Sequence, residues 1–221
     1  ASASPSVATQ AQLNLLSLAI QTQHWSLIPE LLPKIQTRLA QLPPSRSTLT
    51  AQLKLAQNLM CLQSAQNSEP SPFPSPLLES CPAVTLSENA LQGAQIPAWS
   101  EIQNVVSVAL KQSQGLEDRQ SEANALGYLA AIAQQTGRIS EAQALTEQAL
   151  QKISAFDEPE LAYLWQWQLG RLHQLQGKEK EAIAAYTLSF GTLQSLRRDL
   201  VAADSDIQFT FRDSVEPVYR E

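Results

Sequence analysis

The sequence is poor in the residues on which turn-rich folds and most catalytic or metal sites depend. Its 221 residues include only 7 glycines, 2 cysteines and 2 histidines. So few glycines argue against an all-β chain built on tight turns. The cysteines and histidines show no CxxC, HxxE or HExxH spacing, so we expect no metal site, and no glycine-rich phosphate loop occurs. A Cys/His nucleophilic pair would need a closeness and an activating environment that the helical register does not provide. We therefore expect a protein that is not an enzyme and that needs no cofactor.

Long apolar runs and clustered basic residues are missing as well. No run of about eighteen apolar residues occurs, which predicts that no segment spans a membrane. The polar opening, residues 1–6, lacks the basic-then-apolar order of a signal peptide. The net charge is −6, and the one basic pair, Arg197-Arg198, lies in a helical stretch. Nucleic acid is therefore not an expected partner, because phosphate binding needs a clustered basic surface.

The two cysteines leave the cell compartment open. Cys61 and Cys81 bracket a proline-rich segment, and a disulfide between them would close this loop. The alternative is that both are unpaired and act as small apolar residues. A cytoplasmic location is favoured, and export is the alternative if the two cysteines are paired.

Residues that favour helices dominate what is present, with Leu, Ala and Gln in abundance. Two stretches, 129–149 and 169–189, repeat one pattern of small and apolar residues about 40 residues apart. Each stretch has one glycine in its middle, Gly137 or Gly177. Because glycine allows a sharp turn, each stretch is predicted to be a hairpin of two helices.

Small residues indicate where the two helices of each hairpin approach closely. These are Ala130 and Ala142 in the first hairpin, and Gly170 and Ala182 in the second. A larger side chain would splay the helices and cost about 1–3 kcal/mol through overpacking. A single hairpin cannot bury its apolar face alone, so we expect neighbouring hairpins to stack and form a curved surface.

The two clearest hairpins are predicted at residues 121–154 and 158–200. In the first, Ser140 begins a capping box for the second helix, so that its hydroxyl would accept a bond from a free backbone N–H. In the second, Asp157 is the expected cap and Pro159 suits the first helical turn.

Two less regular hairpins are predicted earlier in the chain, at residues 8–40 and 47–114. The second is interrupted by residues 67–97, which contain six prolines. Alternating prolines forbid a helix over 70–76 and favour extended chain. Residues 67–97 are therefore interpreted as an insertion, which is either a spacer or a segment that folds across the neighbouring helices.

The pattern of the two regular hairpins resembles the tetratricopeptide repeat. The departures are Ala133 in place of an aromatic residue, Thr146 in place of a bulky ring, and a period of about 40 residues rather than 34. The resemblance implies an all-α, right-handed superhelical solenoid of about four hairpins that binds a protein or peptide. The residues at the diagnostic positions are Ala130, Gly137, Ala142, Ala149, Gly170, Gly177, Ala182 and Tyr186.

A second resemblance concerns the end of the chain. Residues 193–200 and 207–220 look like the junction that precedes a CHAT domain in tetratricopeptide proteins of cyanobacteria. The resemblance implies that a caspase-like domain with a His/Cys dyad follows beyond Glu221. We then expect residues 1–7 to be a disordered edge, and residues 201–221 to be a linker with the start of a further helix.

The resemblance places a binding groove on the concave face made by the first helix of each hairpin. Only Asn124 and Arg171 are similar in type to the family's carboxylate clamp, so a clamp for a chaperone tail is not expected. The groove is expected to be rich in amides, with Trp167 as an aromatic anchor. The alternative is that Trp167 packs between repeats. The candidate binding residues are Gln57, Met60, Asn124, Gln134, Gln135, Trp167, Arg171 and Gln174.

The leading hypothesis is a scaffold that binds a protein or peptide, with either an outside partner or the adjoining CHAT domain as its ligand. As the recognition or regulatory arm of a longer protein, it would relay occupancy of the groove to that domain. The competing hypothesis is a structural module that drives self-association, because apolar surface left open by an unfinished array could pair in a homodimer.

Overall fold

The computed structural model describes residues 4–66, 75–79, 81–82, 95–155 and 157–200. Within this part of the chain every regular element is a helix and none is a strand, which confirms the predicted all-α class. The helices are α1 (Pro5–Gln21), the 3-10 turn η1 (Trp25–Leu27), α2 (Ile28–Gln41), α3 (Arg46–Gln66), α4 (Pro76–Glu79), α5 (Trp99–Gly115), α6 (Arg119–Gln135), α7 (Ile139–Lys152), α8 (Pro159–Leu175) and α9 (Glu179–Leu200).

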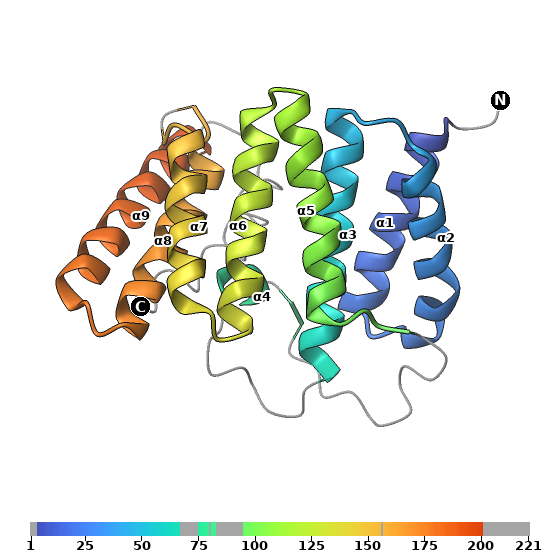
Figure 1. The fold of residues 1–221 in the computed structure, drawn as a ribbon, viewed down its shortest axis with the longest axis horizontal. Coiled ribbons are helices and arrows are strands. Elements are labelled where there is room, and N and C mark those ends of the chain that lie inside the picture. Colours follow the sequence, from blue (N-terminus) through green and yellow to red (C-terminus); the bar gives the residue numbers. More distant parts are fainter. Residues whose placement is uncertain (1–3, 67–74, 80, 83–94, 156, 201–221) are drawn as a thin grey trace.

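The long helices lie side by side in a row that runs from α2 and α1 through α3, α5, α6 and α7 to α8 and α9 (Figure 1). Helix α1 packs against α2 and α3, α3 packs against α5 and α6, α6 packs against α7 and α8, and α8 packs against α9. Helix α3 thus packs against α5, which lies on the far side of the insertion. Helices α3, α6 and α8 come from three different predicted hairpins, and α6 contacts both of the others.

One turn geometry recurs four times along the row. In each case the backbone N–H of one residue donates to the carbonyl five positions earlier, and the preceding N–H donates to the carbonyl three positions before it. This is the Schellman arrangement, which satisfies carbonyls left open at a helix end. The longer bonds are His24 to Ala19 (2.8 Å), Asp118 to Ser113 (3.0 Å), Arg138 to Ala133 (2.8 Å) and Lys178 to His173 (2.9 Å).

The residue that turns the chain in this geometry has a positive φ. Two of the four are the predicted glycines, Gly137 (φ 76°) and Gly177 (φ 70°). The other two are Gln23 (φ 59°) and Glu117 (φ 53°), where a side chain must tolerate the left-handed region. The sequence did not predict these two turns in detail because no glycine indicates them.

Two of the predicted helix caps are wrong. Helix α7 begins one residue before Ser140 and its N-cap is Arg138, which makes no side-chain capping bond. The N-cap of α8 is Glu158 rather than Asp157, although Pro159 does occupy the first turn as predicted. Helix α7 starts directly after the tight turn at Gly137, so the position of this turn decides where the helix begins. In α8, Pro159 takes the first helical position, which suits proline and makes Glu158 the N-cap.

The cap of α5 is half of a capping box. Ala98 precedes the helix and has no side-chain oxygen, so it cannot accept a bond from the first turn. The Glu101 carboxylate instead reaches back and accepts the backbone N–H of Ala98 at 2.8 Å. One of the open N–H groups is therefore satisfied by the carboxylate, which also suits the positive end of the helix dipole.

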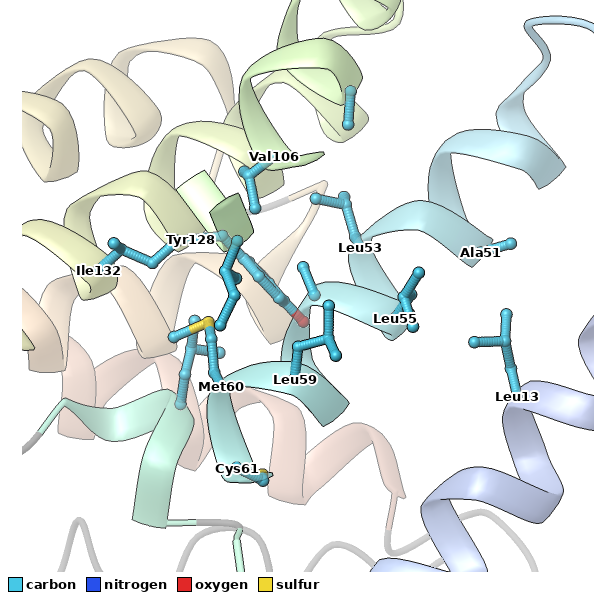
Figure 2. Close-up of a cluster of buried hydrophobic side chains, with 14 of the residues drawn as sticks. Leu13, Ala51, Leu53, Leu55, Leu59, Met60, Cys61, Val106, Tyr128 and Ile132 are labelled. Atoms are coloured by element: carbon cyan, nitrogen blue, oxygen red, sulfur yellow. The ribbon is translucent and has the colours of Figure 1, made fainter. Parts of the chain in front are cut away.

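A continuous apolar core runs along the row from α1 to α8. Figure 2 shows Leu59 and Met60 of α3 in one cluster with Val106 of α5 and with Tyr128 and Ile132 of α6. Trp165 of α8 belongs to the same cluster and meets Tyr128 edge-on, with ring centroids 6.5 Å apart. Burial of these large side chains supplies the main drive for stacking the helices.

Two of the helix contacts in the C-terminal half are made over glycines. A Cβ atom added to Gly127 of α6 would lie 2.3 Å from the ring of Trp165 on α8. A Cβ atom added to Gly170 of α8 would lie 2.5 Å from the ring of Tyr186 on α9. The predicted close-approach residues Ala130, Ala142, Gly170 and Ala182 are all buried.

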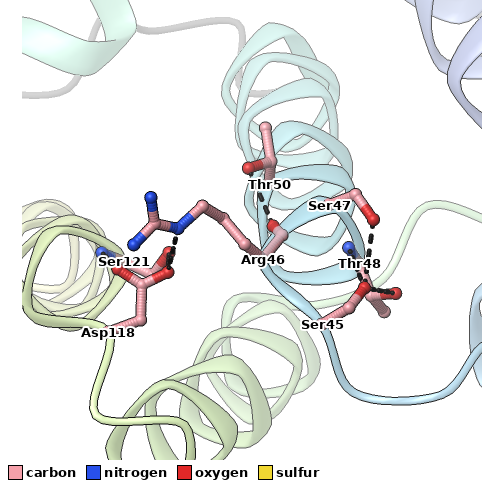
Figure 3. A network of polar contacts seen from close by, with 7 residues as sticks. All are labelled: Ser45, Arg46, Ser47, Thr48, Thr50, Asp118 and Ser121. Carbon is pink, nitrogen blue, oxygen red and sulfur yellow. Dashed lines mark hydrogen bonds and ion pairs between the residues drawn. The ribbon is translucent and has the colours of Figure 1, made fainter.

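A polar bridge joins the starts of α3 and α6 across 72 residues of sequence (Figure 3). The Arg46 Nε donates to Asp118 Oδ2 at 2.8 Å. Asp118 also caps α6, accepting the Ser121 backbone N–H at 3.2 Å and the Ser121 hydroxyl at 2.9 Å. Burial acts to raise the pKa of Asp118, but the bonds from Ser121 and Arg46 outweigh it and hold this pKa below its ordinary value.

Candidate functional site

The predicted binding residues come from three helices that the structure brings together. Gln57 and Met60 lie on α3, Asn124, Gln134 and Gln135 lie on α6, and Trp167, Arg171 and Gln174 lie on α8. Because α6 packs against both α3 and α8, the three helices form one surface, which we call the α3/α6/α8 face.

Three of the predicted contact residues lie in the interior instead of on a surface. Met60 and Gln134 are 0% exposed and Trp167 is 2% exposed. Met60 is part of the main apolar cluster, so its side chain packs against other helices rather than offering a contact to a ligand. The burial of Trp167 fits the alternative that this side chain packs between helices and does not anchor a ligand. The helical register placed these residues on the right helices, but it could not show how much of each surface is covered by other parts of the chain.

The remaining predicted residues keep some exposed surface. Gln57, Asn124, Gln135 and Arg171 are half-buried, and Gln174 is exposed. The Gln174 Oε1 accepts a bond from the Tyr186 hydroxyl of α9 at 2.9 Å, so it lies toward the α8/α9 contact. The accessible part of the α3/α6/α8 face is therefore narrower than predicted, and it is centred on half-buried polar groups.

Arg171 is the most constrained charged group on this face. Its guanidinium carbon lies 5.4 Å from the ring centroid of Trp167, in cation–π geometry. The same guanidinium forms an ion pair with Glu79, the last residue of α4. The side chains of Arg171 and Glu79 are only 14% and 24% exposed. Partial burial makes such a pair less screened by solvent than a surface pair.

Helix α4 is the part of the insertion that covers this face. It packs against α3, α6 and α8, and Figure 1 shows it behind α6. Ser75 is 0% exposed, Pro76 is buried, and Leu77 is 6% exposed within the main apolar cluster. The sequence left open whether the insertion is a spacer or folds across the neighbouring helices. Its described residues around α4 do fold across them.

A disulfide fastens α4 to α3. The Sγ atoms of Cys61 and Cys81 are bonded, and the two Cα atoms lie 5.4 Å apart. Cys61 lies near the end of α3, and Cys81 follows Glu79 by two residues. Of the two alternatives that the sequence left open, the structure therefore shows the paired one.

A buried polar contact explains one departure from the repeat pattern. Thr146 of α7 stands where the pattern has a bulky ring, and its side chain is 0% exposed. The Gln168 Nε2 of α8 donates to the Thr146 hydroxyl at 3.2 Å, and this hydroxyl donates to the Ala142 carbonyl at 2.8 Å. The small hydroxyl thus makes a specific polar link between two hairpins where a ring would make an apolar one.

Groups suited to catalysis are not brought together in the described part of the chain. His24 is exposed, with its Nδ1 2.7 Å from the Thr22 hydroxyl, and His173 is half-buried on α8. Both cysteine sulfurs are used in the disulfide. No group of three His, Cys, Asp or Glu side chains that could hold a metal ion occurs among the described residues. No described helix is both long enough and apolar enough to cross a membrane.

Comparison with known proteins does not add a family. No family model matches the chain, and no curated protein matches it either.

Sequence reasoning missed the two α4 residues that complete the face. Glu79 is one of three acidic residues in the 67–97 insertion, and nothing in its neighbourhood distinguishes it from the other two. Leu77 directly follows residues 70–76, over which alternating prolines had excluded a helix, and that prediction is wrong at Pro76, where α4 begins. The only available signal was the pair of cysteines, which indicated that the end of this segment returns to α3.

Proposed function

We propose that this protein is a non-enzymatic scaffold that binds a protein or peptide segment on the α3/α6/α8 face. The observation that carries the proposal is that this face already holds a short segment of chain, α4, through an apolar side chain and an ion pair. A surface built to hold one segment in this way has the chemistry to hold another. The repeated turn geometry and the small residues at the helix contacts support a rigid array as the framework.

We further propose that the framework is a right-handed, tetratricopeptide-like solenoid of four hairpins. The pairs would be α1 with α2, α3 with α5, α6 with α7, and α8 with α9. Support comes from the contacts within each pair and from the contacts of α6 with both α3 and α8. A preformed framework of this kind spends little of its own conformational entropy on binding, so most of the interaction energy is available for affinity.

We also propose that the scaffold serves a CHAT-domain protein as its recognition or regulatory arm. The proposal rests on the sequence of residues 193–200 and 207–220; the first range lies in α9, and the second lies outside the described residues. The test is the peptidase activity of a longer chain that contains the CHAT domain, with and without residues 1–200. Equal activity of the two chains would contradict a regulatory role.

The binding proposal can be tested by placing a photo-crosslinking amino acid at single positions. Asn124 is half-buried on α6, at a predicted contact position, and Gln148 is exposed on α7. In cell extract, we expect a defined protein adduct from position 124 and none from position 148, which is the matched control. Adducts of equal yield and identity at both positions would argue against a specific face.

A second candidate function is self-association through α9. Ile183 and Leu188 are 65% and 62% exposed, which is unusual for large aliphatic side chains. Leu188 also lines an apolar pocket of about 250 Å³ together with Leu150, Ile153 and Leu169. Light scattering over a range of protein concentrations tests this function. A dimer that disappears with Ile183→Glu would support it, and a monomer at every concentration would remove it.

We take the disulfide as support for export, the alternative location that the sequence left open for paired cysteines. Structural disulfides persist mainly in oxidising compartments, so we propose that this chain is exported. Mass spectrometry of the protein from its own cells, alkylated without reduction, tests the proposal. Alkylation of both Cys61 and Cys81 would contradict it.

A further inference from the structure

Helix α4 is held in the way that a bound peptide is held. It has only four residues, Pro76–Glu79, so its own backbone hydrogen bonds stabilise it little. Its contacts are with α3, α6 and α8, which belong to three different hairpins. Its position therefore depends on the chemistry of the α3/α6/α8 face, and the side chains that fit this face report what the face selects.

Two side chains of α4 make the recognisable contacts. Leu77 is 6% exposed and enters the cluster that contains Met60 and Tyr128. Glu79 pairs with Arg171 of α8. Side chains two residues apart in a helical turn point to different sides of it. This spacing suits a segment that lies between the apolar cluster and α8, with one side chain directed to each.

From these contacts, we propose that the α3/α6/α8 face selects partner segments that present a leucine followed two residues later by a carboxylate, and that α4 is an internal copy of such a segment. The inference rests on the proposed binding function and specifies its ligand. A partner segment of this kind would compete with α4 for the same place.

The charge requirement follows from the surroundings of Arg171. The guanidinium lies over the Trp167 ring, and the Arg171 side chain is 14% exposed, so this side chain has lost most of its water. If Glu79 withdrew without a replacement, a partly buried cation would lose this ion pair, which is costly. A carboxylate from a partner restores the pair, whereas an amide or a cation does not.

The apolar requirement follows from the place of Leu77. Its withdrawal would leave a cavity in the apolar cluster, whose other members include the fully buried Leu59 and Met60. An aliphatic side chain of similar volume fills this cavity, whereas a polar one would lose its hydration without gaining a partner. A segment that satisfies only one of the two requirements is therefore expected to bind weakly.

The disulfide gives α4 an advantage over any free competitor. Because Cys81 is bonded to Cys61 two residues beyond Glu79, Glu79 is held at a high effective concentration beside Arg171. A free segment must overcome this advantage before it can bind. We therefore expect the protein with the disulfide to bind a free copy of α4 poorly.

The test uses a labelled peptide that copies residues 74–82 with serine in place of Cys81, measured by fluorescence anisotropy against the full chain. In the first protein, Cys61→Ser and Cys81→Ser are combined with Glu79→Arg, which places a cation against Arg171 and displaces α4. We expect this protein to bind the peptide at least about 10-fold more tightly than the wild type does. Peptides that also carry Leu77→Ser or Glu79→Arg are expected to lose about 10-fold in affinity.

The second protein reverses the charge on the other side. Cys61→Ser and Cys81→Ser are combined with Arg171→Glu, which places two carboxylates together and again displaces α4. This protein is expected to bind the Glu79→Arg peptide and to reject the peptide that keeps Glu79. If both proteins prefer the same peptide, or if neither binds any peptide, the inference is wrong.

Two further measurements keep the result interpretable. Far-UV circular dichroism and gel filtration show whether both variants keep the helical fold. If either does not, the chain with only Cys61→Ser and Cys81→Ser is measured, and equal affinity for the two peptides would overturn the inference. An adduct at position 124 together with no peptide binding would sink this inference but leave the binding function standing. If the peptides bind as expected but position 124 gives no adduct, the proposal of an outside protein partner is wrong.

Discussion

The two ends of the helix row are held together in different ways. From α1 to α5, large aliphatic side chains fill the interior, two turns carry non-glycine residues at positive φ, and a disulfide fastens the insertion. From α6 to α9, both corresponding turns have glycine, and helices meet over Gly127 and Gly170 with a ring against the glycine.

The difference shows two routes to the same kind of hairpin. In the C-terminal region, the two tight turns and the two contacts with a ring each have a glycine at the place where it is needed. In the N-terminal region, the same turn is imposed on Gln23 and Glu117, so the surrounding packing must offset the cost of a left-handed residue. The C-terminal region is therefore the one in which single substitutions at small residues should have the sharpest effects.

The largest effect is expected from Trp165→Ala, because this side chain is 0% exposed and joins the core to α8. We expect a loss of about 3–5 kcal/mol in the free energy of unfolding, measured by urea denaturation. Gly127→Ala should destabilise the wild type through its clash with the ring, and this cost should vanish in the Trp165→Ala protein. A cost of Gly127→Ala that is the same in both proteins would show that the ring does not set it.

In the N-terminal region, the disulfide is expected to make the comparable contribution to stability. Replacing Cys61 and Cys81 together by serine is expected to lower the free energy of unfolding by about 3 kcal/mol for a closed loop of this length. The wild type should lose the same amount when a reductant is added, whereas the double variant should not respond to it. If the wild type has the same urea midpoint of unfolding with and without reductant, the prediction is wrong.

The pair of Gly170 and Tyr186 tests whether ring and glycine depend on each other. At the equivalent positions of the preceding hairpin the chain has Ala130 and Thr146, where a smaller side chain accompanies a Cβ atom. Gly170→Ala is expected to cost about 1–3 kcal/mol through overpacking against the Tyr186 ring. In the Tyr186→Thr background this cost should disappear, which urea denaturation of the four proteins of the cycle would measure.

The matched control for that cycle is Gly191→Ala in α9. An added Cβ atom there meets nothing within 4 Å. Since alanine favours a helix more than glycine does, this variant should gain up to about 1 kcal/mol. A loss at Gly191 as large as that at Gly170 would mean that close contact is not the cause.

The four turns provide a smaller and more direct comparison of the two regions. Gln23→Gly and Glu117→Gly are each expected to raise the free energy of unfolding by about 0.5–1 kcal/mol, because glycine tolerates positive φ. Gly177→Ala should lower it by about 1 kcal/mol, although open space surrounds that position. Thermal unfolding of the three variants checks this, and changes of the same sign in all three would break the comparison.

The smallest expected effect concerns pH and the bridge between the regions. The pKa of Asp118 lies below its ordinary value of 3.8, so the stabilisation from its charge is complete above that value. As the pH falls below it, the unfolded chain takes up the proton first, and the stabilisation is lost on the way down to the folded pKa. Because the Arg46 side chain is 72% exposed, the bridge should contribute less than about 1 kcal/mol.

Asp118→Asn isolates this charge, since asparagine also caps helices well. Urea denaturation between about pH 6 and about pH 3 should show a shallower loss of stability in the variant than in the wild type. Parallel curves would show that the charge of Asp118 does not contribute.

Much of the helix framework was predictable, and the reason is local. Helix formers, Gly137, Gly177 and Pro159 define α6 to α9 within a few residues, because each acts on the backbone next to it. The caps at Ser140 and Asp157 were predicted wrongly, since the turn at Gly137 sets the start of α7 and Pro159 takes the first position of α8.

The candidate site was predictable only as a set of helices. The repeat register placed Arg171 and Trp167 on α8, but the depth of Trp167 depends on packing that no local pattern reports. The partner of Arg171 is Glu79, which lies 92 positions earlier in the sequence, and only the folded chain shows which acidic residue reaches it.

Helix α4 also changes how the molecule is expected to unfold. In a plain linear array each unit touches only its neighbours, so the ends fray independently of the middle. A brace that touches α3, α6 and α8 at once couples units that would otherwise melt separately, and so raises their cooperativity. Occupancy of the α3/α6/α8 face by α4 would then decide whether the helices unfold in one cooperative transition or in several separate ones.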